Sequence, residues 1–146
     1  MEKLNIRDMH LSDLKEIENI YDTEFQNTWK ISILESELSN SSSKYIVAHI
    51  ADKIVGFAGV LFSVDTADIT NIVVRKTYRH MAIGSKLLEE LINLAKENNK
   101  NCLTLEVNIN NVYAQQLYTK YNFKNLGIRK KYYNGTDDAY IMTLYL

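Results

Sequence analysis

Apolar residues along the chain recur with two spacings, one typical of strands and one typical of helices. In strand-like stretches they alternate with polar residues or form short runs, and in helix-like stretches they return every three or four positions. The strand pattern covers residues 4–9, 44–51, 54–64, 67–75 and 102–108, and residues 124–146 predict two strands around an Asn134-Gly135 turn. The helical pattern covers residues 11–25, 31–38, 83–98 and 111–121.

Local signals refine these elements. We expect Ser12 to be the N-cap of the first helix and an Asp52-Lys53 turn to join the second and third strands. The apolar stripe of the first helix consists of Leu14, Ile17, Tyr21 and Phe25. The stripe of the helix at 83–98 consists of Leu87, Leu88, Leu91, Ile92 and Ala95.

The order of elements is β, α, α, β, β, β, α, β, α, β, β. It predicts an α/β fold whose mixed sheet is antiparallel at first and parallel where the two helical crossovers occur. With 146 residues and no repeat, linker or low-complexity segment, the chain is expected to form a single domain over residues 1–146.

Composition excludes several classes of protein. The 17 basic and 18 acidic residues nearly balance, so no nucleic-acid-binding face is expected. The single cysteine, Cys102, allows no intramolecular disulfide and fits a reducing compartment. His10, His49 and His80 have no metal-ligand spacing, so no metal is expected. Without a signal peptide or an apolar run long enough to span a bilayer, we expect a cytoplasmic protein with no membrane partner.

The stretch from Asn71 to Ser85, NIVVRKTYRHMAIGS, joins an apolar strand to an amphipathic helix. Such a turn aims consecutive backbone N–H groups and the positive end of the helix dipole at one spot, which favours a phosphate or pyrophosphate. Neither G-x-x-x-x-G-K-[ST] nor G-x-G-x-x-G occurs, so a nucleoside-triphosphate loop and a dinucleotide fold are not indicated. Since alanine resists positive φ, we expect the turn to hold an anion only if Ala82 has an ordinary negative φ.

Two further residues stand out as candidates for chemistry. Glu106 lies inside the apolar strand Leu103–Val107, on the face opposite its leucines. That face either is simply solvated or opens into a cleft between covering helices. Tyr118 falls on a helical stripe with Tyr113, Leu117 and Tyr121, so it is either a core residue or a functional one.

The turn R-x-x-A-x-G at Arg79–Gly84 resembles the Q/R-x-x-G-x-G/A signature of the GCN5-related N-acetyltransferases, the GNAT family. Leu117–Phe123 resembles the family's L-Y-x-x-x-G-F motif, with Asn122 in place of glycine. Together with L-E-V at 105–107, these motifs and their spacing are similar to one branch, the RimI-type bacterial ribosomal-protein-alanine N-acetyltransferases. The order of elements is also that of the family, so the resemblance covers nearly the whole chain.

The resemblance implies direct transfer of the acetyl group of acetyl-CoA to an N-terminal alanine of a small-subunit ribosomal protein. It makes Glu106 the general base and Tyr118 the general acid, which suits their chemistry. It implies a strongly twisted sheet of about seven strands with four helices, in which the fourth and fifth strands splay apart at Ile72 and Leu105 to admit the cofactor.

The resemblance also assigns binding residues. Those implied for acetyl-CoA are Ile72, Val73, Val74, Arg79, His80, Met81, Ala82, Ile83, Gly84, Ser85 and Asn111. Those implied for the acceptor are Trp29, Tyr132, Asp137 and Asp138, the two aspartates being either partners for an arginine at the acceptor's second position or solvated turn charges. A monomer or weak dimer is expected.

Other functions remain open from the residues. The same catalyst could act on a polyamine, an amino sugar or a lysine side chain, or the chain could be an adaptor that binds acyl-CoA without turnover. The presence of both Glu106 and Tyr118 argues against a pure binder. An acetyl-cysteine route through Cys102 is disfavoured because no histidine lies near it in sequence.

Overall fold

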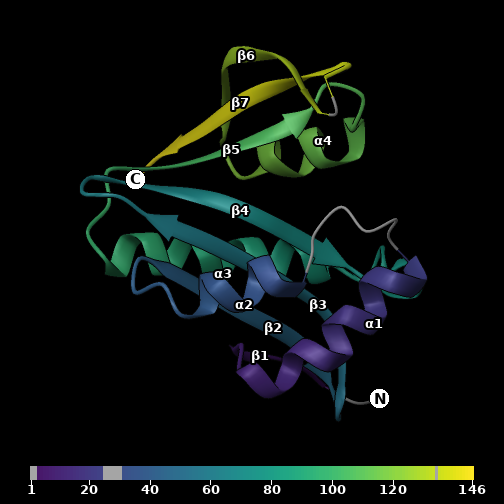
Figure 1. The fold of residues 1–146 in the computed structure, drawn as a ribbon. Helices are drawn as coiled ribbons and strands as arrows, with labels where there is room; N and C mark the ends of the chain where they lie inside the picture. The colour runs from purple at the N-terminus through teal and green to yellow at the C-terminus, as the bar shows by residue number, and fades with distance from the viewer. Residues whose placement is uncertain (1–2, 25–30, 134) are drawn as a thin grey trace. The chain divides into compact units, whose positions relative to one another are not determined.

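The computed structural model describes residues 3–24, 31–133 and 135–146. Its strands are β1 (Leu4–Asp8), β2 (Ser43–Ile50), β3 (Lys53–Phe62), β4 (Thr66–Val74), β5 (Cys102–Asn108), β6 (Lys124–Tyr133) and β7 (Asp137–Tyr145) (Figure 1). Its helices are α1 (Leu14–Glu24), α2 (Ile31–Leu38), α3 (Ile83–Glu97) and α4 (Val112–Lys120), with short 3₁₀ helices η1 (Leu11–Asp13) and η2 (Lys76–Tyr78). The predicted α/β fold with seven strands and four helices is confirmed.

The seven strands form one sheet in the order β1-β2-β3-β4-β5-β7-β6. β1, β2 and β3 pair antiparallel, and β4 pairs parallel with β5 after the α3 crossover. The prediction of a second parallel pairing was wrong, because β7 lies between β5 and β6 and is antiparallel to both. The α4 crossover therefore leads to a strand that is not the neighbour of β5.

Residues that lie close together in space divide the chain into two compact units. The first contains the residues up to Leu61 and Thr70–Leu91, and the second contains Phe62–Ile69 and Ile92–Leu146. β4 and α3 each run from one unit into the other, and the last residue of β3, Phe62, also belongs to the second unit.

In the first unit, α1 and α2 cover one face of the antiparallel strands (Figure 1). The apolar stripe predicted for α1 is buried at Leu14, Ile17 and Tyr21, while Phe25 lies outside the described residues. Tyr21 meets Phe57 of β3 edge to face, with ring centroids 5.6 Å apart. The stripe thus holds α1 onto the sheet as its spacing predicts.

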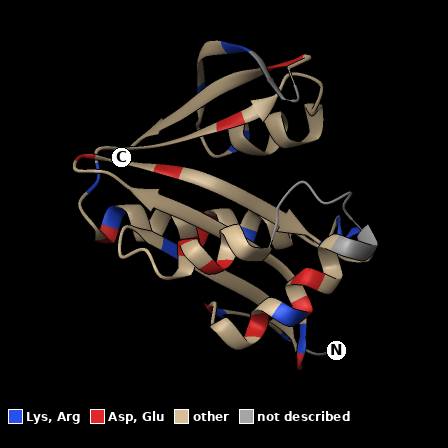
Figure 2. Ribbon diagram, in the orientation of Figure 1, with Lys and Arg blue, Asp and Glu red and all other residues tan. Residues whose placement is uncertain are grey.

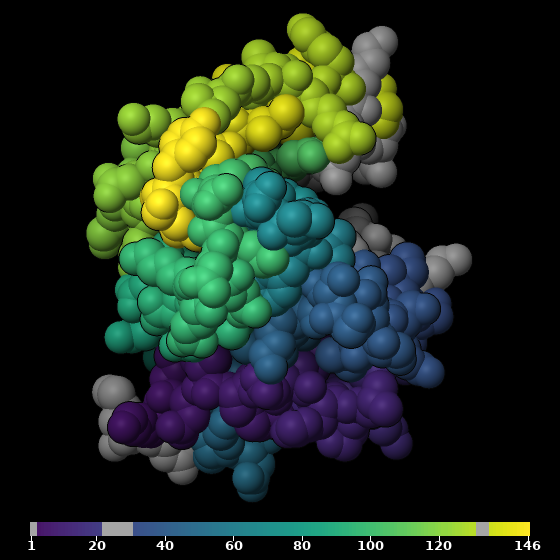
Figure 3. Space-filling view, turned by 90° about the vertical axis from the view of Figure 1, so that its left-hand side faces the viewer, coloured from purple at the N-terminus to yellow at the C-terminus, as the bar shows by residue number. Residues whose placement is uncertain are grey.

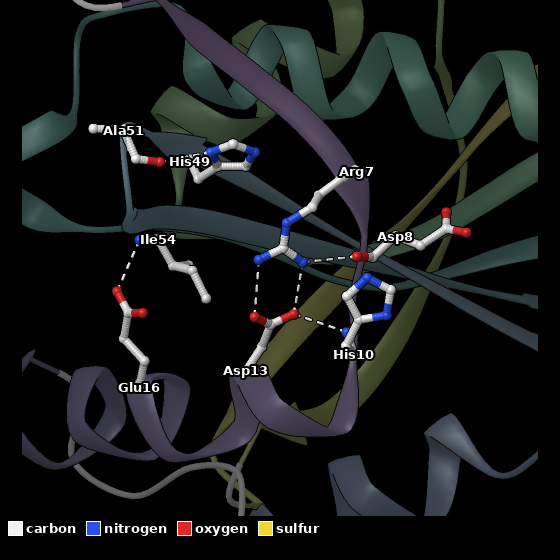
Figure 4. A network of polar contacts seen from close by, with 8 residues as sticks. All are labelled: Arg7, Asp8, His10, Asp13, Glu16, His49, Ala51 and Ile54. Atoms are coloured by element: carbon white, nitrogen blue, oxygen red, sulfur yellow. Dashed lines mark hydrogen bonds and ion pairs between the residues drawn. The ribbon is translucent and has the colours of Figure 1, made fainter.

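The chain enters α1 differently from the prediction (Figure 4). His10, not Ser12, precedes the first helical turn, and its backbone N–H donates to Asp13 Oδ2 at 2.7 Å. Both oxygens of Asp13 also accept from the guanidinium of Arg7, at 2.8 and 2.9 Å. This hydrogen-bonded guanidinium holds the pKa of Asp13 below its ordinary value. Asp13, three residues after His10, therefore caps this turn in place of the predicted Ser12.

α3 packs closely against the first unit's strands through Gly56 of β3. A Cβ atom at Gly56 would lie 2.7 Å from the backbone oxygen of Val73 and 3.3 Å from Leu87 Cδ1. Leu87, Leu88 and Leu91 of α3 are fully buried, as their spacing predicts. The missing side chain thus lets β4 and the first turns of α3 approach β3.

In the second unit, β5, β7 and β6 form a three-stranded antiparallel ribbon, and β6 and β7 lie side by side at the surface (Figure 3). Along β5, Leu103, Leu105 and Val107 are buried while the alternate residues are partly exposed, which confirms the predicted alternation.

Charged residues of both signs are interspersed along α1 and α3 (Figure 2). Among the residues that the structure describes, no helix combines the length and the apolar character needed to cross a membrane.

Candidate functional site

The first part of the candidate site is the end of β4. In the described chain, the ladder with β5 includes β4 only from Thr66 to Asp68, paired with Cys102 to Thr104. Ile72, Val73 and Val74 follow beyond this paired stretch. The divergence of the two strands at Ile72 and Leu105 stays a prediction.

The turn after β4 has two residues in the left-handed region, His80 with φ of 67° and Ala82 with φ of 60°. The turn was predicted to hold an anion only with a negative φ at Ala82, and this condition is not met. Alternation between left-handed and right-handed residues curls the backbone into a nest, whose N–H groups converge on an anion. Ala82 thus adopts the conformation for which a glycine is usually needed, at a cost of about 1–2 kcal/mol.

α3 begins immediately after this nest. The carbonyl of Ala82 accepts the N–H of Lys86 at 3.1 Å, so Ala82 is the residue from which the helix starts. Ile83, Gly84 and Ser85 form the first turn, where a helix has no partner of its own for its N–H groups. Nest, helix dipole and first-turn N–H groups together suit a diphosphate.

The charge around the turn also favours an anion. Residues 75–86 include Arg75, Lys76, Arg79 and Lys86 and no acidic residue. The predicted cofactor residues from Arg79 to Ser85 are consecutive in this one turn, which fits the diphosphate of a coenzyme A ester. Their contacts with a cofactor stay a prediction.

A chain of polar side chains connects α2 to β4 in the first unit. Tyr45 of β2 donates from its hydroxyl to Glu37 Oε2 at 2.8 Å, and the same hydroxyl lies 3.0 Å from Thr70 Oγ1. Thr70 in turn donates to Asn71 Oδ1 at 3.1 Å. Burial raises the pKa of the Tyr45 hydroxyl, so this group stays protonated as a hydrogen-bond donor. The network fixes the residue just before Ile72.

In the second unit, Glu106 projects from the partly exposed face of β5. Its Oε1 accepts from Arg129 Nη1 of β6 at 2.9 Å, and its Oε2 is buried. Arg129 was not among the predicted site residues, because the pattern along one strand does not reveal which residue of a non-neighbouring strand shares its face.

Tyr118 lies in the last turn of α4, and the end of that helix explains the L-Y-x-x-x-N-F motif. Asn122 has φ of 72°, which confirms the expectation that it takes the left-handed conformation ending the helix. Phe123 N donates to the carbonyl of Tyr118 at 3.1 Å and Asn122 N to that of Thr119 at 2.9 Å, the two bonds of a Schellman motif. The Phe123 ring lies 5.7 Å from the Tyr118 ring, so the same motif packs against the phenol.

The loop after β5 is held by asparagines. Asn111 is the N-cap of α4, and its side chain accepts from Ala114 N at 3.1 Å. Asn108 Nδ2 donates to Asp137 Oδ2 at 3.1 Å, and Lys130 Nζ lies 3.9 Å from Asp138 Oδ2. Both predicted acceptor-binding aspartates therefore already have a partner in the protein.

The other predicted residues add less. Trp29 lies outside the described residues, and Tyr132 is described only as part of strand β6. Cys102 is a partly buried free thiol at the start of β5. In the described parts of the chain, no group of three or more His, Cys, Asp or Glu side chains is arranged to hold a metal ion.

The strand-to-helix turn, with its two left-handed residues and the first turn of α3, is of the kind that suits the diphosphate of a phosphorylated carrier. The profile of the Acetyltransferase (GNAT) family matches residues 14–123. The chain belongs to this family and is an acetyltransferase.

One relative by sequence and one solved structure are similar to nearly the whole chain. A Bacillus subtilis protein, provisionally named a [ribosomal protein bS18]-alanine N-acetyltransferase, is 36% identical over 143 residues, which cover 96% of this chain and 94% of that protein. The crystal structure of the ribosomal-protein-S18-alanine N-acetyltransferase from Escherichia coli superimposes with a TM-score of 0.89 at 27% identity, covering 98% of this chain and 94% of that one.

A third comparison concerns the fold alone. A GNAT family acetyltransferase from Elizabethkingia anophelis, whose crystal structure contains acetyl-CoA, has a TM-score of 0.79 at 21% identity and full coverage of both chains. The fold is therefore one on which acetyl-CoA binding has been observed directly.

Proposed function

We propose that the protein transfers the acetyl group of acetyl-CoA to the N-terminal α-amino group of alanine in a small-subunit ribosomal protein. The observation that carries the proposal is the 36% identity to the Bacillus subtilis relative over nearly the whole chain. The nest at His80 and Ala82, with the first turn of α3, supports a coenzyme A diphosphate as the bound anion.

An α-amine is a favourable acceptor on chemical grounds. Only a neutral amine attacks a thioester, and an α-amino group with a pKa of about 7.7–8.0 is neutral in roughly a tenth of molecules at pH 7. A lysine side chain, with a pKa of about 10.4, is neutral in well under about a thousandth. In this proposal Glu106 takes a proton from the attacking nitrogen as the tetrahedral intermediate forms. Tyr118 provides a hydrogen bond or proton to the departing thiolate.

The acceptor is tested by following release of coenzyme A with three amines. These are a peptide starting Ala-Arg-Tyr, the same peptide with a blocked N-terminus and an internal lysine, and spermidine. We expect turnover with the free alanine terminus alone. Turnover confined to lysine or spermidine would reject the ribosomal acceptor, and tight acetyl-CoA binding without any turnover would favour an adaptor.

Two variants test the catalytic roles. Replacing Glu106 with Gln keeps the shape of the side chain and removes the base, so kcat should fall by about 10²–10⁴-fold with little change in acetyl-CoA affinity. Tyr118→Phe keeps the ring against Phe123 and removes only the hydroxyl. An unaltered rate in either variant would remove that residue from the mechanism.

The predicted partners and compartment follow from this acceptor. A ribosomal substrate would place the reaction in the cytoplasm. No direct contact with RNA is proposed, because the 17 basic and 18 acidic residues nearly balance. A monomer or weak dimer would suffice, and sedimentation velocity at assay concentration checks this.

A further inference from the structure

The carboxylate of Glu106 is held by a residue on a strand that is not its neighbour. Arg129 Nη1 of β6 lies 2.9 Å from Glu106 Oε1 of β5, although β7 separates the two strands. In the register, Glu106 pairs with Ile141 of β7 and Ile141 pairs with Gly127 of β6. Arg129 is two residues farther along β6 than Gly127, so its long side chain reaches diagonally across one face of the ribbon.

The local sequence makes this reach possible. Gly127 has no side chain and leaves the face beside Ile141 open, since even a Cβ there would only approach Ile141 Cδ1 to 3.7 Å. The register between β6 and β7 also shifts on both sides of the segment, between Asn125 and Gly127 and again after Arg129. Such irregularities re-aim side chains within a strand.

We propose that Arg129 is a positioning residue for the general base Glu106. The proposal rests on the proposed function, because it gives Arg129 a role only through the proton transfer assigned to Glu106. A glutamate has three side-chain torsions, and an unheld carboxylate would occupy several rotamers on a partly exposed face. The charge-assisted hydrogen bond to one oxygen selects one rotamer and orients the carboxylate.

Arg129 is poorly suited to a purely structural role. Its side chain is 57% exposed, and that of Glu106 is 27% exposed. Ion pairs at such exposure contribute little to stability because solvent screens them and the long side chains lose freedom. The consequence of losing Arg129 should therefore appear in the rate of acetyl transfer much more than in the unfolding temperature.

The experiment is a double-mutant cycle with Glu106→Gln, Arg129→Gln and the double variant, run with whichever amine the wild type acetylates fastest. Arg129→Gln should lower kcat by roughly 10- to 100-fold, in line with misplacement of a catalytic group. It should leave acetyl-CoA affinity and the unfolding temperature unchanged. In the double variant, kcat should equal that of Glu106→Gln within about twofold, because Arg129 then has no base to position.

Two further variants serve as controls. Arg129→Lys should recover most of the lost rate, because the contact joins one nitrogen to one oxygen and an ammonium can replace it. Lys124→Gln removes the same charge from the same strand at an exposed position without touching Glu106, and it should match the wild type.

The outcomes separate the inference from the function on which it rests. A wild-type kcat in Arg129→Gln, or an equal further loss when Arg129→Gln is added to Glu106→Gln, would overturn the positioning role and leave the base intact. A wild-type kcat in Glu106→Gln would instead reject the base itself, and the positioning role with it.

Discussion

Ala82 holds a backbone conformation that an L-residue with a Cβ atom adopts at a cost. Its φ of 60° and that of His80 at 67° shape the nest before α3, so the cost is concentrated at the point where an anion would bind. Ala51, in the turn between β2 and β3, has φ of 52° and is the same residue type in a similar conformation at another turn. The two alanines provide a matched pair.

Replacing Ala82 with Val should weaken acetyl-CoA binding by about tenfold or more, because a β-branched residue disfavours positive φ far more than alanine does. Ala51→Val is the control. Both variants should lose about 1–2 kcal/mol of stability, but only Ala82→Val should change the Kd measured by calorimetric titration. An equal Kd in the two variants would show that the nest does not bind the cofactor.

Asp13 should make a contribution to stability that depends on pH. Its hydrogen bonds from Arg7 lower its pKa in the folded state below the ordinary value of 3.8. A group with a lowered pKa stabilises the fold above its unfolded value, and that contribution disappears as the pH falls through the folded value. Asp13→Asn should therefore lower stability by about 1–2 kcal/mol at pH 7, and the difference from wild type should shrink below about pH 4.

Thermal unfolding at several pH values between 7 and 2.5 measures this difference. Asp8→Asn is the control, because Asp8 is 61% exposed and its pair with Lys44 lies at the surface. That variant should match the wild type throughout. A constant difference between Asp13→Asn and wild type across the pH range would contradict the assignment.

At the scale of elements, Gly56 sets the distance between β3, β4 and α3. Gly56→Ala should destabilise the protein by about 1–3 kcal/mol, since its Cβ would lie 2.7 Å from a backbone oxygen that cannot move alone. Because that oxygen belongs to Val73, the variant should also weaken acetyl-CoA binding. Gly127→Ala is the control, since its Cβ would meet only Ile141 Cδ1 at 3.7 Å, and it should be neutral or stabilising in chemical denaturation. A neutral Gly56→Ala would contradict this account.

The elements also show what the sequence could predict. The stretches at 31–38 and 102–108 were predicted to the residue, because regular apolar spacing reflects which face is buried. The predicted start at Leu11 agrees with η1, but the predicted cap Ser12 was wrong, because the side chain of Asp13 accepts from the backbone of His10 and is held by Arg7 of β1. The predicted Asp52-Lys53 turn lies one residue earlier, at Ala51 and Asp52, since Ala51 takes a conformation that propensity assigns to glycine or asparagine.

The same limit applies to the candidate site. Glu106 and Tyr118 were singled out because each sits in a motif along one segment, and the Schellman ending at Asn122 gives the second motif a physical reason. Arg129, which binds Glu106, was not predicted, because it reaches Glu106 across an intervening strand. Pairing between distant strands is decided by the whole sheet, which no local spacing encodes.

At the scale of the whole molecule, the two compact units share β4 and α3. If the expected single domain over residues 1–146 is right, both units should unfold together, because melting either one would break a strand and a helix that continue into the other. Differential scanning calorimetry should then give one transition whose calorimetric and van't Hoff enthalpies agree. Gly56→Ala in the first unit and Leu103→Ala in the second, where Leu103 is fully buried, should each shift that one transition. Two transitions, each moved only by the variant in its own unit, would instead mean that the chain folds as two domains and that the shared elements do not couple them.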